Sequence, residues 1–197
     1  MTKRRLIITF LVIFAPGTTL AADLPADCSA AQAPTQPLEA SIGGTKYAPE
    51  FVKLIKSGAM KSDDEAFDTY RLTLRNVDNL MAPLDMEVTV IVPQGKSIDG
   101  KVFRRLPTKS ISKQHMASKT SGLPEIQGWS YADRKAGTRG SHVAYVASLR
   151  LEFGERQGET IPGTIFLCVP KGQTSFFDKT PTAEDSYAIG AFEALVQ

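Results

Sequence analysis

The fold class is decided by residues 143–153, which read VAYVASLRLEF. Every odd-numbered position in this stretch is apolar, whereas Ser148, Arg150 and Glu152 occupy the even-numbered positions of its second half. Side chains of a β-strand alternate between its two faces, so an apolar period of two predicts a long strand with one buried face. We therefore expect a mainly β protein.

Other stretches repeat or extend this pattern. Residues 70–75 and 86–92 also alternate between apolar and polar side chains, which predicts two more half-buried strands. Residues 161–169 are apolar on both faces after Gly163, as in a strand covered on each side, and residues 187–196 supply a further strand. Turns rich in Gly, Pro, Asn and Asp separate these runs, so the sequence predicts an antiparallel β-sandwich or a barrel-like domain.

Two short segments near the start of this domain carry more specific signals. Residues 41–47 place Gly43 and Gly44 between apolar and aromatic residues, which predicts a hairpin or a bulge. Residues 49–57 have apolar side chains at helical spacing, with Pro49 suited to a first turn and Gly58 to a stop. We expect one short helix there, and a strand is the alternative.

The first residues of the chain describe an export signal. Three basic residues precede a ten-residue apolar run, residues 6–15, and Thr19-Leu20-Ala21 offers a small-x-small cleavage site. Ten residues of helix span about 15 Å, too little for a hydrocarbon core of roughly 30 Å. We therefore expect residues 1–21 to be removed, residues 22–40 to form an Ala- and Pro-rich tail, and residues 41–197 to form one β-rich domain that is periplasmic or secreted.

Only two cysteines, Cys28 and Cys168, occur in the sequence. In an oxidising compartment two cysteines of an exported chain are most simply a disulfide. A bridge that closes so long a loop contributes about 4 to 5 kcal/mol on the loop-entropy model. The alternative is a buried Cys168 thiol in a strand and an unpaired Cys28 in the tail.

Charge is concentrated in the middle of the chain. Removal of residues 1–21 changes the formal charge from +2 to −1. Residues 101–145 nevertheless carry +7, between flanking segments of −5 and −3. The candidate binding residues of this basic segment are Arg104, Arg105, Lys109, Lys113, Arg134 and Arg139.

If the loops of this basic segment share one end of the domain, they form a cationic patch. Such a patch attracts anionic partners by a screened, salt-dependent force. For an exported chain these partners are an anionic envelope component or an acidic protein surface, and nucleic acid is a poor fit. The alternative is a solvated face whose charges pair with the acidic segments. Trp129, the only tryptophan, is either a contact residue beside the patch or a core residue of a strand.

No pattern in the sequence specifies a catalytic, metal or cofactor site. Only two histidines exist, and Ser141 next to His142 places nucleophile and base on opposite sides of an extended chain. Three acidic residues after Ser62 lack the alternation of a calcium loop. We therefore expect a non-catalytic binding or envelope-associated module without metal or cofactor. The alternatives are a hydrolase with a loop site near His142 and a structural subunit of an extracellular assembly.

Overall fold

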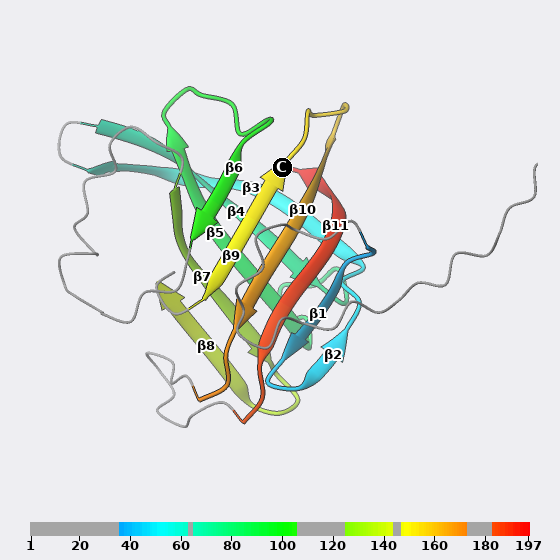
Figure 1. Ribbon diagram of the computed structural model, residues 1–197. Coiled ribbons are helices and arrows are strands. Elements are labelled where there is room, and N and C mark those ends of the chain that lie inside the picture. The colour runs from blue at the N-terminus through cyan, green and yellow to red at the C-terminus, as the bar shows by residue number, and fades with distance from the viewer. Residues whose placement is uncertain (1–35, 63–64, 106–124, 144–146, 173–182) are drawn as a thin grey trace, which may run out of the picture.

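The computed structural model describes residues 36–62, 65–105, 125–143, 147–172 and 183–197. These residues form eleven β-strands and no helix (Figure 1). The strands are β1 (Glu39–Ile42), β2 (Thr45–Tyr47), β3 (Phe51–Ser62), β4 (Glu65–Arg75), β5 (Leu84–Pro93), β6 (Val102–Arg105), β7 (Glu125–Asp133), β8 (Thr138–Val143), β9 (Ser148–Phe153), β10 (Thr160–Val169) and β11 (Ser186–Val196). The predicted mainly β class is confirmed.

One continuous sheet contains all of these strands. Its order is β6-β9-β10-β11-β3-β4-β5-β7-β8, and β1 pairs with both β11 and β2. Every pairing is antiparallel except that of β11 with β3, where Leu195 lies opposite Lys53 and Val196 opposite Leu54. The sheet curls so that β9, β10 and β11 lie in front of β3, β4 and β5, which makes the domain sandwich- or barrel-like (Figure 1).

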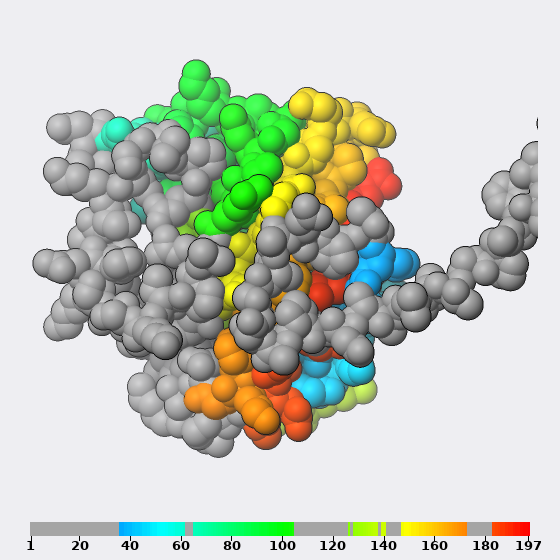
Figure 2. Space-filling view, viewed as in Figure 1, coloured from blue at the N-terminus to red at the C-terminus, as the bar shows by residue number. Residues whose placement is uncertain are grey.

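A single main core fills the space between the two halves of the sheet. Even-numbered residues of β4 and β5 face it, including Leu72, Leu74, Met86 and Val88, all of them fully buried. Their odd-numbered neighbours therefore point to the outer face of the sheet, because successive side chains of a strand alternate. β6 is the first strand in the order of the sheet, and it lies beside β9 on the surface of the molecule (Figure 2).

The predicted short helix in residues 49–57 is wrong, because this segment belongs to β3. Val52 and Leu54 pack toward the core with a period of two, and β3 pairs with β4 along almost its whole length. Apolar residues at 51, 52, 54 and 55 fit both periods, and the backbone hydrogen bonds offered by two neighbouring strands decide in favour of the strand. Gly58 lies at a register shift within β3 and does not end it.

The stretch that predicts the fold class is divided between two strands. Val143 ends β8, which pairs with β7, whereas Ser148–Phe153 forms β9, which pairs with β6 and β10. Ala147, Leu149 and Leu151 are buried, so the alternation predicts the core face correctly. The expected single long strand is nevertheless wrong, since the two parts pair with different strands.

The predicted hairpin at residues 41–47 is confirmed. Ile42 of β1 lies opposite Thr45 of β2, and the two residues between them, Gly43 and Gly44, have φ values of 55° and 93°. Positive φ at both central positions is the conformation that a two-residue hairpin requires and that glycine adopts without strain.

Candidate functional site

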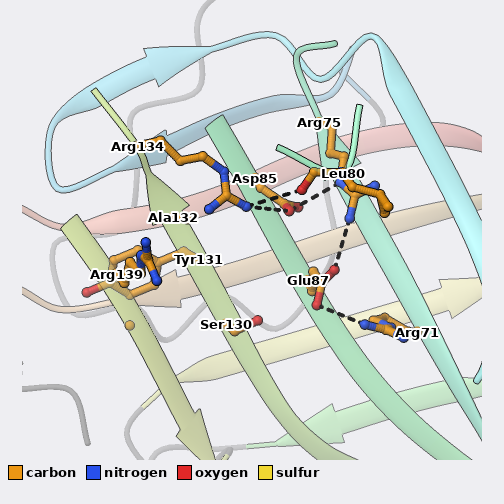
Figure 3. Close-up of a pocket in the computed structure, with 11 residues that line it drawn as sticks. Arg71, Arg75, Leu80, Asp85, Glu87, Ser130, Tyr131, Ala132, Arg134 and Arg139 are labelled. Carbon is orange, nitrogen blue, oxygen red and sulfur yellow. Dashed lines mark hydrogen bonds and ion pairs between the residues drawn. The ribbon is translucent and has the colours of Figure 1, made fainter. Parts of the chain in front are cut away.

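The outer face of β4, β5, β7 and β8 carries a surface hollow of about 570 Å³ (Figure 3). We call it the arginine hollow. Four arginines and two carboxylates stand around it, and small side chains form part of its lining. The residues that line it are Arg71, Arg75, Leu80, Asp85, Glu87, Ser130, Tyr131, Ala132, Arg134, Arg139 and Gly140.

Strand register explains why a hollow forms at this place. Arg75 lies opposite Asp85, Asp85 opposite Ala132, and Ala132 opposite Arg139, so the four residues make one row across four strands. The next row on the same face places Glu87 opposite Ser130. Ala132 and Ser130 have short side chains between the long side chains of the neighbouring strands, so β7 forms the floor of the arginine hollow.

One side of the arginine hollow is a nearly buried ion-pair network. Arg75 Nε lies 3.2 Å from Asp85 Oδ2, and Arg75 Nη2 donates a hydrogen bond of 3.2 Å to Glu87 Oε1. Arg71 Nη1 approaches Glu87 Oε2 at 3.6 Å. The side chains of Arg75 and Asp85 are only 10% and 9% exposed, so their charges depend on each other for compensation.

Arg134 connects this network to the β4–β5 turn. Its Nε donates a hydrogen bond of 2.8 Å to the Ala82 carbonyl, and its Nη2 donates one of 3.3 Å to the Leu80 carbonyl. The same Nη2 lies 3.9 Å from Asp85 Oδ2. Arg134 therefore fixes the turn of residues 76–83 against the β7–β8 turn.

Arg139 stands on the other side of the arginine hollow. It is exposed, and no described residue forms an ion pair with it, which Figure 3 shows as an arginine set apart from the dashed interactions. The other three arginines share the two carboxylates. With Arg139, the lining has four arginines and two carboxylates, so its formal charge is +2. The site therefore offers a free guanidinium to an incoming anion, in the planar geometry that suits carboxylate and phosphate.

Asp85 is more enclosed than Glu87, the other carboxylate of the arginine hollow. Within the described part of the chain, its Oδ1 is buried and accepts no hydrogen bond. Burial and the nearby Asp85 charge raise the pKa of Tyr47, whose hydroxyl donates to the Leu74 carbonyl at 3.2 Å, so Tyr47 stays neutral. Ser130 and the more exposed Glu87 also line the arginine hollow, so a ligand that brings both an anionic group and hydroxyl groups would match Arg139 and these side chains together.

The β7–β8 turn that carries Arg134 is itself held by a carboxylate. Asp133 Oδ1 accepts hydrogen bonds from the backbone N–H groups of Lys135 and Ala136, at 3.1 and 3.0 Å. Burial alone would raise the pKa of Asp133, but these bonds, with one from the Thr45 hydroxyl, outweigh it and hold the pKa below its usual range. The ionised carboxylate therefore orders the turn beside the arginine hollow.

The structure brings together two of the six basic residues that the sequence singles out. Arg134 and Arg139 line the arginine hollow, whereas Arg104 is exposed on β6 and is not among the lining residues. Arg105 ends β6, and Lys109 and Lys113 lie outside the described residues. A patch that joins both basic loops stays a prediction.

The remaining candidates from the sequence lie elsewhere. Trp129 is buried in the main core and stacks on Tyr131 at a ring-centroid distance of 5.4 Å, as the core alternative expects. His142 is in β8, where its backbone pairs with that of Trp129 in β7. The side chain of His142 is outside the described part of the structure. Cys168 is buried in β10, and Cys28 lies outside the described residues, so the disulfide stays a prediction.

Sequence reasoning missed four of the six charged residues of the site. Arg71, Arg75, Asp85 and Glu87 come from strands outside the basic segment, and only the register of four strands places them beside Arg139. A signal existed, because long charged side chains occupy the outer positions of two successive predicted strands.

Among the residues that the structure covers, no group of His, Cys, Asp or Glu is arranged to hold a metal ion. The same residues include no helix long and apolar enough to cross a membrane. Comparison with protein-family models, curated proteins and solved structures finds no match to this chain.

Proposed function

We propose that this protein is an exported, non-catalytic binding module that holds an anionic group of an envelope component in the arginine hollow. The observation that carries the proposal is the unpaired, exposed Arg139 at the end of a row in which the other charges are already compensated. An anion that enters meets a guanidinium which has no internal competitor among the described residues, so binding requires no ion pair to be broken.

The other polar side chains that line the arginine hollow narrow the ligand class. The Glu87 side chain is 20% exposed and Ser130 lies opposite it in the strand register, so both can exchange hydrogen bonds with the hydroxyl groups of a ligand. Phosphate esters that also carry free hydroxyl groups fit both features. We use sn-glycerol 3-phosphate as the soluble probe, because it combines a phosphate with two hydroxyls.

The experiment compares the wild-type protein with Arg139→Ala and with the matched variant Arg104→Ala. Binding of sn-glycerol 3-phosphate is followed by NMR chemical-shift changes at several salt concentrations. We expect Arg139→Ala to weaken binding about tenfold, the value of one charge-assisted contact, and Arg104→Ala to leave it unchanged. Equal effects of the two substitutions, or no binding by the wild-type protein, would overturn the proposal.

Export also supports a bridge between Cys28 and Cys168. The Ala191 N–H donates a hydrogen bond of 2.7 Å to the Gln36 carbonyl, which fixes the chain beside β11. Ala191 lies opposite Thr164 of β10, four residues along the strand from Cys168. The eight residues from Cys28 to Gln36 can extend about 27 Å, which is enough to reach. Thiol titration of the denatured, unreduced protein tests the bridge: we expect no free thiol, and two free thiols would overturn it.

A further inference from the structure

The turn between β4 and β5 exposes large apolar side chains. Leu80 is 79% exposed and Met81 is 66% exposed, and Val77 of the same turn is also exposed. Among the residues that the structure covers, Val102 on β6 is the one other large apolar side chain exposed in this way. Apolar side chains that gather at one place on a surface, and are not scattered singly, mark an interaction site.

Hydrogen bonds hold this turn in one shape. The Met81 N–H donates to Asn79 Oδ1 at 2.7 Å, and the Ala82 N–H donates to the Asn79 carbonyl at 3.1 Å. Arg134 ties the carbonyls of Leu80 and Ala82 to the neighbouring turn. Leu80 and Met81 are therefore presented outward by a fixed backbone, so the ordering of the turn is complete before any partner arrives.

Positive charge lies beside the apolar tip. The adjacent β7–β8 turn brings Arg134 and Lys135, and Arg139 follows it on β8. The one acidic residue of the apolar turn, Asp78, is neutralised by Lys53 Nζ at 2.6 Å. Asp133 is buried under the β7–β8 turn, so its charge is turned away from the surface.

We infer that residues 76–83 and the β7–β8 turn form a docking surface for an anionic lipid bilayer, with Leu80 and Met81 entering the interface. This inference rests on the proposed function, since the headgroup phosphate is the anion that the arginine hollow receives. Apolar side chains buried at the acyl boundary and cations at the headgroup level are the two contributions that bind proteins to anionic bilayers. The turn supplies the first, and Arg134, Lys135 and Arg139 supply the second.

The test measures sedimentation with vesicles of phosphatidylglycerol and, separately, of phosphatidylcholine. The protein is expressed from its full sequence and purified as the cell processes it. We expect Leu80→Ser with Met81→Ser to weaken binding to phosphatidylglycerol vesicles at least about tenfold, because two apolar side chains leave the interface. Val102→Ser removes the exposed apolar side chain of β6, away from the turn, and its binding should equal that of the wild type.

A second variant reports insertion directly. Leu80→Trp should shift its fluorescence to shorter wavelength with phosphatidylglycerol vesicles and not with phosphatidylcholine vesicles, against the constant signal of buried Trp129. If Leu80→Trp shows no shift, or if the double serine variant binds vesicles as tightly as the wild type, the inference is overturned. Met81→Ser alone changes a side chain that does not line the arginine hollow. It should weaken binding to phosphatidylglycerol vesicles and keep the binding of sn-glycerol 3-phosphate if the proposed function is correct, so the two failures are distinguishable.

Discussion

Arg75 and Arg139 occupy the two ends of one cross-strand row and have opposite environments. Arg75 lies between two carboxylates and is nearly buried, whereas Arg139 is exposed and unpaired among the described residues. The difference follows from what lies beside each arginine: Arg75 faces Asp85, and Arg139 faces Ala132. The same type of residue therefore stabilises the sheet at one end of the row, as Arg75, and is available to a ligand at the other, as Arg139.

The largest loss of stability should come from replacing Arg75, at the buried end of the row. Arg75→Met leaves Asp85 and Glu87 without their shared cation, and loss of one partner of a buried ion pair costs about 3 to 5 kcal/mol. Urea denaturation measures the change in the free energy of unfolding. The control is Arg156→Met, because Arg156 is a half-exposed arginine 3.9 Å from Asp99 and should cost about 1 kcal/mol or less. Equal costs for the two variants would contradict the division between the two ends of the row.

A smaller loss of stability should follow from removing the carboxylate of Asp133, which holds the β7–β8 turn beside the exposed end of the row. Asp133→Ala removes the acceptor for two backbone N–H groups, which we expect to cost about 1 to 2 kcal/mol at neutral pH. The pKa of Asp133 is lowered in the folded protein, so its stabilisation is present above the unfolded value of about 4 and is lost as pH falls through the folded value.

The difference in unfolding free energy between the wild type and Asp133→Ala should therefore shrink in acid. Denaturation at a series of pH values measures it. Val102→Ser changes an exposed side chain of β6 that carries no charge and serves as the control, because it leaves every carboxylate in place. A difference in unfolding free energy that stays constant down to pH values well below the unfolded pKa would contradict the view that the ionised carboxylate of Asp133 stabilises the turn.

The smallest effect on stability should come from the exposed end itself. Arg139→Ala removes a side chain that has no ion pair in the described residues, so the free energy of unfolding should change by about 0.5 kcal/mol or less. Thermal denaturation without ligand measures this value, and the same variant should lose most of its ligand binding. A large loss of stability would mean that Arg139 has a structural partner.

The sequence predicts the faces of most strands but not their partners. Alternation at Leu72, Leu74, Met86 and Val88 identifies core positions, because a period of two depends only on neighbours along the chain. The pairing of Asp85 with both Arg75 and Ala132 depends on register between strands, which no local pattern specifies. The arginine hollow was therefore beyond prediction, although two of its arginines were identified.

The two errors in the fold have the same origin. Residues 49–57 carry apolar side chains that suit a helix or a strand, and only the presence of β4 and β11 on either side selects the strand. The alternation from Val143 to Phe153 continues across a point where the chain leaves one partner and joins others. Both features are decided by tertiary contacts.

The short parallel contact between β11 and β3 governs how this sheet can assemble. It is the link between β6-β9-β10-β11 and β3-β4-β5-β7-β8, and the Gln197 N–H extends it by donating to the Leu54 carbonyl at 2.9 Å. Closing it joins residues about 140 positions apart, so we expect this contact to form late and slowly during folding. A chain that lacks residues 195–197 would retain the two sets of paired strands but would lose the backbone pairing of β11 with β3 that joins them.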